Sequence, residues 1–503
     1  MNSFNLIQNP WIPVLYANGD HTLVSLETAF KEAEQIADLD CLPHERISLM
    51  RLLVCITQTV YKPPATYYDW DGYADDMETG IPQYLQQRDI YPHFNLFGDG
   101  PRFLQVPLQD TSSPVKVSKL ISHLATGNNT TLFDQESNDK VPRTFSPAVL
   151  AKALVTFQNF YPLYGAGHKG KGGPCVVSNM LHTLAIGASL RQTLIKNCLT
   201  QEVIEDSSPY GCGTPLWELS SDNDDFETIA TLSYLGRLVP RHRDIHLSED
   251  GTQFYLSKKA IQYPEFEIFR EPSATVTIAE KQGKKSRYLL SAKLDKAIWR
   301  DLHLITVVKN NTIEEAYAPL CLQSHAVDAA EEPTLWVGAL VTKQAKIIDV
   351  VESSLTVPPT MFLEDGRTIY QKGLEYAERI SKQLYTAVKQ YGKELKQYGK
   401  ELKHDNPPVE AAKRHYWNAL DREVRTLLDL VRHPESRKDS FGEGNDPWTQ
   451  AVRSSAIAAY EFACPRQTPR QLKAYAEGLR TLYPKIQPKP KKHYEQRARN
   501  LSK

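Results

Sequence analysis

Residues 370–402 read YQKGLEYAERISKQLYTAVKQYGKELKQYGKEL, and this stretch decides the C-terminal part of the fold. Its apolar and aromatic residues recur at spacings of three and four or their sums, which predicts one long amphipathic helix. The heptapeptide KQYGKEL occurs twice in tandem, at 389–395 and 396–402. Each copy adds about two helical turns and keeps the apolar stripe on one face. The glycine in each copy weakens the helix by roughly 1 kcal/mol relative to alanine.

Three further helices are predicted after this one. The second starts after Pro407-Pro408 and carries apolar residues on one face from Val409 to Val431. The third runs from Pro447 to Ala463, and the fourth has Thr468 as its N-cap and Pro469 at its first position. Short connections between four amphipathic helices predict a four-helix bundle over residues 365–486. Residues 487–503 form a basic tail.

Residues 1–364 have a different character, because short strand-like runs alternate with helical ones. Buried helices are predicted at 46–61 and 176–197. No regular βαβ alternation is visible, so the expected class is α+β, with a large irregular mixed α/β domain before the bundle. Residues 107–147 are polar and loop-like, and a loop of this length favours a functional role. The predicted strands are 254–258, 275–280, 287–293, 304–308 and 335–341.

The composition is that of a soluble globular protein, with 41% hydrophobic and 24% charged residues. A net charge of −1 excludes a protein that coats nucleic acid with its whole surface, so any such binding uses local patches. No apolar run reaches the ~18 residues of a membrane span, and the N-terminus lacks the features of a signal peptide. The seven scattered cysteines form no C-x-x-C pair, which fits a reducing, cytoplasmic location.

Catalytic and metal-binding signatures are absent from the sequence. It contains no H-E-x-x-H and no G-x-S-x-G motif. HRDIH (242–246) places two histidines four residues apart, but no third ligand is evident nearby, so exposed loop histidines are favoured over a metal site. We therefore expect a protein that is not an enzyme and holds no metal or cofactor.

The glycine-rich stretch YGAGHKGKGG (164–173) admits three interpretations. From Gly165 it reads G-x-x-x-x-G-K, like a phosphate-binding P-loop, but Gly172 stands where Ser or Thr would bind magnesium. A P-loop also opens directly into a helix, whereas the next helical pattern here begins near Val176. A plain surface connection is the second interpretation. The third is a backbone surface that lies against nucleic acid, since glycine allows close approach and Lys169 adds positive charge.

Three other places have residues suited to recognition. ATGNNTTLFDQESN (125–138) is a polar loop whose Phe133 could stack on a base or pack into the core. Lys343 and Gln344 follow an apolar strand where the chain is expected to turn, and a solvated hairpin tip is the alternative. Lys258 and Lys259 form a small basic point.

Six segments, taken in order, resemble the CasA family, the large subunit of the type I-E CRISPR surveillance complex Cascade. Each motif is weak evidence alone, but all six occur in the same order as in the family, and the resemblance covers nearly the whole chain. The segments are NPWIPV (9–14), PHFNLFGDGPRFLQV (92–106), KLISHLATGNNTTLFDQ (119–135), the glycine stretch (165–173), LWVGALVTKQAKI (335–347) and AAKRHYW (411–417).

The resemblance implies a non-catalytic role in RNA-guided antiviral defence. A CasA subunit reads the short motif (PAM) that flanks a double-stranded DNA target and opens the duplex beside it. Pairing with the CRISPR guide RNA then reads the sequence. The implied partners are target DNA, guide RNA, the other Cascade subunits and a separate helicase-nuclease that the subunit helps to recruit. A P-loop-like nucleotide-binding enzyme and a purely architectural subunit remain the alternatives.

The resemblance also assigns roles to individual positions. The glycine loop would contact the minor groove, Lys258 or Lys259 would add a donor there, and Gln344 beside Lys343 would wedge below the last motif base pair. Two departures from the family pattern are Ala166, within what is often a glycine run, and Lys343, where an amide is common. The glycine-loop residues are Gly165, Ala166, Gly167, His168 and Lys169, and the residues for guide-RNA contact are Asn129, Phe133 and Gln135.

Overall fold

The computed structural model divides the chain into two compact units, each described here by itself. The first comprises Met1–Ile298, Val307–Val327 and Pro333–Thr356, and the second comprises Trp299–Thr306, Asp328–Glu332 and Val357–Lys503. The structure describes residues 4–108, 113–122, 144–160, 175–176, 178–220, 223–264, 270–281, 284–308, 317–325, 331–343, 346–396, 409–434 and 440–486.

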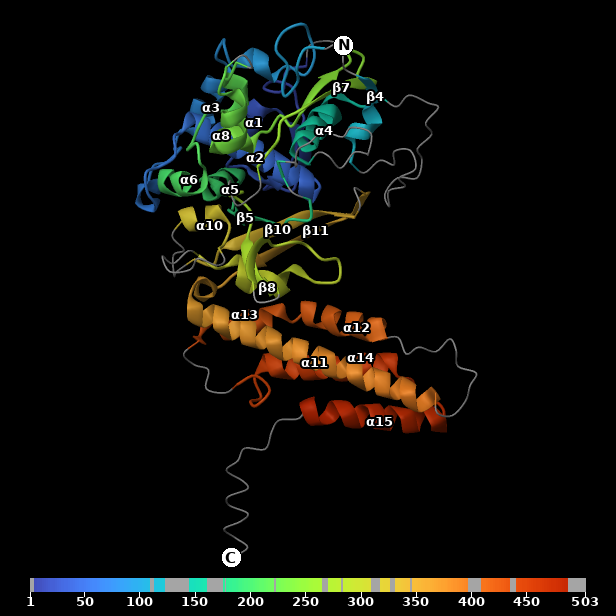
Figure 1. The fold of residues 1–503 in the computed structure, drawn as a ribbon. Coiled ribbons are helices and arrows are strands. Elements are labelled where there is room, and N and C mark those ends of the chain that lie inside the picture. The colour runs from blue at the N-terminus through green and yellow to red at the C-terminus, as the bar shows by residue number, and fades with distance from the viewer. Residues whose placement is uncertain are drawn as a thin grey trace, which may run out of the picture. The chain divides into compact units, whose positions relative to one another are not determined.

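The first unit mixes helices with small sheets in which every described strand pair is antiparallel (Figure 1). The sheets have the strand orders β2-β1-β3, β11-β10-β5, β4-β7-β6 and β8-β9. The strands are β1 Ile12–Tyr16, β2 His21–Val24, β3 Ile36–Leu39, β4 Ser113–Lys116, β5 His182–Ile186, β6 Arg243–Leu247, β7 Gln253–Ala260, β8 Val276–Lys281, β9 Lys284–Leu289, β10 Thr334–Lys343 and β11 Lys346–Thr356. This antiparallel, irregular arrangement agrees with the expected mixed α/β class.

The helices of the first unit are mostly short. The α-helices are α1 Leu26–Lys31, α2 Pro43–Val60, α3 Met77–Leu85, α4 Pro147–Phe160, α5 Leu190–Asn197, α6 Gln201–Ser207, α7 Phe226–Leu232, α8 Tyr234–Leu238 and α10 Leu320–Ser324. The 3-10 turns are η1 Tyr67–Trp70, η2 Tyr91–Phe94, η3 Val117–Leu120 and η4 Leu216–Glu218, with η5 Ile298–Asp301 at the border of the two units.

Helix α2 is buried along nearly its whole length and packs against α4. It begins at Pro43, a residue that suits the first helical position because it has no N–H to satisfy. The Glu45 carboxylate accepts the Leu42 N–H at 3.2 Å and the Lys152 ammonium of α4 at 2.8 Å. The helix predicted for 46–61 is therefore confirmed.

Two of the family-like motifs supply core residues of the first unit. Trp11 is 1% exposed, and its indole N–H donates to the Leu6 carbonyl at 3.0 Å. Phe94 and Phe103, from the segment 92–106, stack with ring centroids 5.2 Å apart. These motifs hold the domain together, as the burial of large aromatic rings is strongly stabilising.

Parts of the sequence-based description are wrong. The helix predicted for 176–197 is strand β5 followed by α5, because residues 182–186 pair with Thr334–Gly338 of β10. The strand predicted for 304–308 begins instead within the short helix α9, Leu302–Ile305. The supposed loop 107–147 contains β4 and η3.

The second unit is helical, as expected. The long helix α11, Glu364–Lys396, packs against α12, α13, α14 and α15 (Figure 1). The other helices are α12 Val409–Asp421, α13 Val424–Arg432, α14 Pro447–Ala463 and α15 Pro469–Ile486, with η6 Pro359–Phe362 before α11. Thr468 caps α15 as predicted, because its hydroxyl accepts the Gln471 N–H at 3.2 Å.

The single second helix predicted over 409–431 is wrong, since it is broken into α12 and α13. At the break, Glu423 has φ −102° and ψ 5°, and the N–H groups of Arg422 and Glu423 bond three residues back. This tighter turn ends α12, while Leu427, Leu428 and Val431 of α13 remain buried.

Aromatic side chains with satisfied polar atoms fill the core of the second unit. The Tyr416 hydroxyl, from the motif at 411–417, donates to the Ala377 carbonyl at 2.8 Å. The Trp448 indole donates to the Gly373 carbonyl at 3.0 Å. A Cβ at Gly373 would lie 2.5 Å from Leu427 Cδ1, so a larger residue there would require neighbouring side chains to shift. No helix among the described residues has the length and apolar character that crossing a membrane requires.

Deletion of one KQYGKEL copy should leave the second unit folded. Because the copies are identical, either deletion gives the same chain, and Tyr391 of the remaining copy still donates to the Pro465 carbonyl at 2.7 Å. The apolar stripe turns by only about 20° over a heptad. We expect a stability change below about 1 kcal/mol, against about 3 kcal/mol for Tyr391→Ala, which empties a buried site. Thermal denaturation followed by circular dichroism measures both, and an equal loss in the two variants would contradict the expectation.

Candidate nucleic-acid interface

The predicted DNA-contacting glycine loop, Gly165 to Lys169, lies outside the described residues, but the two ends of its segment are fixed. Helix α4 ends at Phe160, which is 2% exposed, and the chain is described again at Cys175, which is also 2% exposed. The Val176 N–H donates to the Asn159 carbonyl at 3.1 Å. The segment therefore leaves and returns at one buried point.

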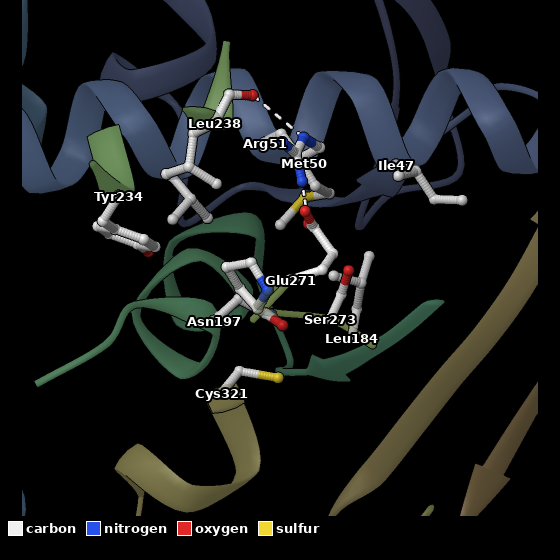
Figure 2. A pocket seen from close by; sticks show the side chains of 12 residues that line it. Ile47, Met50, Arg51, Leu184, Asn197, Tyr234, Leu238, Glu271, Ser273 and Cys321 are labelled. Carbon is white, nitrogen blue, oxygen red and sulfur yellow. Dashed lines mark hydrogen bonds and ion pairs between the residues drawn. The ribbon is translucent and has the colours of Figure 1, made fainter. Parts of the chain in front are cut away.

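A buried ion pair lies beneath this point. Figure 2 shows the Arg51 guanidinium of α2 between the Leu238 carbonyl, which accepts from its Nε at 3.1 Å, and the Glu271 carboxylate. Arg51 Nη2 lies 3.4 Å from the Cys175 sulfur, and the thiol donates to the Arg237 carbonyl at 3.3 Å. Burial raises the pKa of Cys175, which keeps the thiol neutral. Removing one partner of such a buried pair costs about 3–5 kcal/mol, because the remaining charge is left uncompensated.

The cavity beside this cluster is small. Its volume is about 30 Å³, and the lining includes Met50, Leu184 and Tyr234 as well as the Arg51–Glu271 pair (Figure 2). Ligand pockets for molecules of drug size have volumes of about 300–1,000 Å³, so this cavity is too small for a nucleotide.

The order of elements around the glycine stretch also differs from that of a P-loop. A P-loop follows a strand and opens into a helix whose N-terminus holds the phosphates. Here the stretch follows helix α4, and the described residues 175–176 and 178–181 are not helical and precede strand β5. The helix expected near Val176 is absent from these residues, so the P-loop interpretation loses its structural basis.

The last turn of α4 also fixes the strands that hold the candidate lysines. The Gln158 amide, which is fully buried, donates to the Arg243 carbonyl and accepts the Arg243 N–H, both at 2.9 Å. Next to this point the β6–β7 register shifts, so that residues 257–259 lie opposite Asp244 alone. Such bulges are frequent beside functional sites because they re-aim side chains. Lys258 and Lys259 belong to this bulge of β7, but the structure does not describe their side chains.

Of the two candidate wedge residues the structure describes Lys343, which lies at the end of the β10–β11 pairing. Lys343 is the last residue of β10, is exposed, and pairs with Lys346 of β11. This confirms that the apolar strand ends in a turn, although Gln344 itself lies outside the described residues. Asn179, four residues after Cys175, bonds to the hairpin, because its Oδ1 accepts the Thr342 N–H at 2.6 Å.

The candidate guide-RNA loop precedes α4 in the chain, whereas the glycine stretch follows it. Asn129, Phe133 and Gln135 lie outside the described residues, but the chain before them is anchored: Ser122 Oγ lies 2.7 Å from His44 Nε2 of α2. Helix α4 has 14 residues, so its two ends lie about 20 Å apart.

Described bonds flank three of the four predicted contact segments. Asn159–Val176 joins the chain on the two sides of the glycine stretch, Gln158–Arg243 lies beside the lysine bulge, and Asn179–Thr342 lies beside the hairpin tip. Sequence reasoning missed these anchors. Gln158 and Asn159 give a signal, since they are polar residues within the apolar run ALVTFQNF (153–160) of a buried helix.

The histidines of HRDIH do not lie in an exposed loop, which corrects the expectation. His242 comes directly before β6 and is 1% exposed, and His246 lies on β6 with its Nδ1 3.0 Å from the Val106 carbonyl. Among the described residues no group of three or more His, Cys, Asp and Glu side chains could hold a metal ion.

Comparison with known proteins identifies the family. The family model described as CRISPR-associated protein Cse1 matches residues 5–459. The chain belongs to the Cse1 family. The resemblance to CasA is thereby confirmed, since a CasA/Cse1 protein of Thermus thermophilus is 27% identical to this Cse1-family chain over 515 residues, covering 95% of the chain and 96% of the relative.

Solved Cse1 structures share the fold. Thermus thermophilus CasA (Cse1) superimposes with a TM-score of 0.73 at 22% identity, covering 97% of this chain and 99% of that one. Thermobifida fusca Cse1 gives 0.74 at 20% identity, covering 96% and 97%. A chain from a structure described as a CRISPR RNA-guided surveillance complex gives 0.71 at 18% identity, covering 96% and 99%. The mixed α/β part and the C-terminal helices of this Cse1-family chain therefore follow the Cse1 fold.

Buried histidines make the stability of the first unit depend on pH. Burial lowers the pKa of His182 to about 3 and those of His242 and His325 to about 4. Since these values lie below the usual 6.5, the unfolded chain binds more protons, and stability falls as the pH drops below 6.5. When the pH falls from about 7.5 to about 5.5, each of these histidines should lower the free energy of unfolding by roughly 1 kcal/mol.

Urea unfolding followed by tryptophan fluorescence at these two pH values tests this expectation. His325→Phe keeps a ring stacked on Trp70, where the centroids are now 4.1 Å apart, and removes one titrating group. The pH-dependent loss should shrink by roughly 1 kcal/mol in this variant, because the proton-linked contribution of His325 is gone. An unchanged loss would show that His325 does not contribute.

Proposed function

We propose that this Cse1-family chain is the subunit of an RNA-guided surveillance complex that reads a short motif beside a DNA target and opens the duplex there. One observation supports the proposal: the last turn of α4 bonds to Arg243 beside the lysine bulge and to Val176 after the glycine stretch, and Asn179 a little further along bonds to Thr342 beside the hairpin tip. A relative of the same fold comes from a structure described as a CRISPR RNA-guided surveillance complex, which supports the assembly.

The glycine stretch would act through its backbone. Gly165, Ala166 and Gly167 have little or no side chain, so the chain can approach the floor of a minor groove. Donors and acceptors in that groove are degenerate, so recognition there tolerates several motif sequences. Lys258 or Lys259 would add a donor to the groove or to phosphate. The shared anchors would place the wedge hairpin next to the motif.

Duplex opening would follow from the hairpin tip. Gln344 would insert beside the last motif base pair. Unstacking one base step there costs roughly a few kcal/mol. Guide-RNA pairing then continues the opening almost without net cost per base pair. The loop with Asn129, Phe133 and Gln135 would contact the guide RNA, within reach of the same helix α4.

The helical unit would serve protein partners. We propose that α11, the broken pair α12–α13, α14 and α15 act as a four-helix bundle that docks other subunits and helps to recruit a helicase-nuclease. The chain itself would carry out no catalysis, and it would work in the cytoplasm.

Complexes assembled with and without this chain test the proposal. On fully paired target DNA, the complex that lacks the chain should bind much more weakly, whereas both should bind single-stranded target. Equal binding of paired DNA by both complexes would leave only an architectural role. Titration of the chain with a fluorescent ATP analogue tests the enzymatic alternative, which tight magnesium-dependent binding would favour.

Lys343→Ala should weaken binding of the complex to paired targets and to targets already unpaired beside the motif by the same factor. The exposed Lys343 ammonium would contact phosphate in both cases. Loss of one phosphate contact should lower the slope of log affinity against log salt by about one unit. Gel shifts over a salt series measure the slope, and an unchanged slope would show that Lys343 contacts no phosphate.

A further inference from the structure

Asn179 has an unusual backbone conformation for a residue with a side chain. Its φ is +69°, in the left-handed region, where asparagine is tolerated better than most residues. It lies three residues before β5, which begins at His182 and pairs with β10 at Gly338. The positive φ marks the place where the chain arriving from Cys175 and Val176 turns onto the edge of β10.

Asn179 continues the β10 ladder with both its backbone and its side chain. Its N–H donates to the Leu340 carbonyl at 2.9 Å. Its Oδ1 accepts the Thr342 N–H at 2.6 Å, and its Nδ2 lies 3.4 Å from Thr342 Oγ1. On the opposite side its carbonyl accepts the Ala292 N–H at 2.7 Å. The side chain therefore replaces a backbone partner at the position where the neighbouring chain has turned away.

Thr342 is the point where the hairpin needs such support. The register with β11 shifts between Val341 and Thr342, so the ladder is interrupted there. Beyond the shift only the pairs Thr342–Ile347 and Lys343–Lys346 precede the turn. A short hairpin tip beyond a bulge has few hydrogen bonds of its own. A side chain that bonds to the first residue of the tip therefore restricts the direction of the tip.

We propose that Asn179 is a positioning residue that sets the direction of the hairpin tip relative to the segment returning from the glycine stretch. This inference rests on the proposed function, in which the glycine stretch reads the motif and the tip opens the duplex. Asn179 contacts neither DNA nor RNA in this proposal. Through its bonds to Thr342 it fixes the distance between the segment that follows the glycine stretch and the hairpin tip.

The test compares Asn179→Gly and Asn179→Asp in the assembled complex. Glycine adopts the same positive φ and removes only the side-chain bonds, whereas aspartate keeps the acceptor for the Thr342 N–H and can accept from its hydroxyl. Binding is measured on a fully paired target and on one already unpaired beside the motif. Asn179→Gly should weaken paired binding about tenfold, the value of one or two hydrogen bonds, and Asn179→Asp should restore most of it.

Pre-opened DNA should bind the Asn179→Gly complex within about twofold of the unaltered one, because the tip has no opening left to do. Equal weakening on both targets, or no weakening on either, would overturn the inference. Gln344→Ala run in parallel separates the two proposals. If Gln344→Ala shows a paired-target defect and Asn179→Gly does not, the positioning role alone is wrong. If Gln344→Ala shows no such defect, the opening role fails and the inference falls with it.

Discussion

Gly165→Asp and Gly167→Asp should each abolish binding of paired target DNA by the assembled complex. Either substitution adds a carboxylate to a backbone that we propose to lie in the minor groove, where it would fill the space and repel phosphate. Placing like charges together costs several kcal/mol, so we expect a loss of about 100-fold or more. Gel shifts with a motif-bearing duplex measure it.

Gly100→Asp is the matched control for these two variants. Gly100 is exposed in the first unit, and a Cβ there meets nothing within 4 Å, so the same charge is added in open space. The control should bind target DNA within about twofold of the unaltered complex, as expected for a surface substitution. All three variants should have the same thermal midpoint. Normal target binding by either loop variant would show that the glycine stretch is not at the groove.

Gln344→Ala should weaken binding to fully paired DNA by about tenfold and leave binding to a target pre-opened beside the motif nearly unchanged. Unstacking one base step costs roughly a few kcal/mol, and a wedge offsets part of this cost. The wedge contributes little once the step is already open. The association rate on paired DNA should fall as well, because opening precedes guide pairing. Binding kinetics on the two targets measure both quantities.

Lys343→Ala, at the paired end of β10, distinguishes a wedge from a general contact at the same hairpin tip. It should weaken both targets alike and change the salt slope, whereas Gln344→Ala should leave the slope unchanged. Equal weakening of both targets by Gln344→Ala would make the glutamine an ordinary contact or a turn former.

The sequence predicted those elements whose signal lies within a short window of residues, such as the spacing of apolar side chains along a helix. The spacing of apolar residues from 370 onward gave the long helix, because one face of α11 is buried along its length. The same reasoning failed at 176–197, since an apolar run of this kind fits a buried strand as well as a helix. Pairing with β10, which lies 148 to 156 residues further along the chain, favours the strand.

The candidate interface was predicted only in part for a similar reason. The glycines, the lysines and the glutamine stand out by residue type, and the family resemblance gave them roles. Their anchors do not stand out, because Gln158 and Asn179 act through partners 85 and 163 residues away. Such long-range hydrogen bonds leave a local trace only as polar residues inside apolar runs.

The most direct test of the account uses a library of paired targets that match the guide and carry a randomised flank. The library is selected with complexes assembled with and without this chain, and the bound fractions are sequenced. We predict that binding depends strongly on the flank when the chain is present and not at all when it is missing, and that Gly165→Asp removes the dependence. Unchanged flank selection by complexes that lack the chain would contradict the claim that it reads the motif.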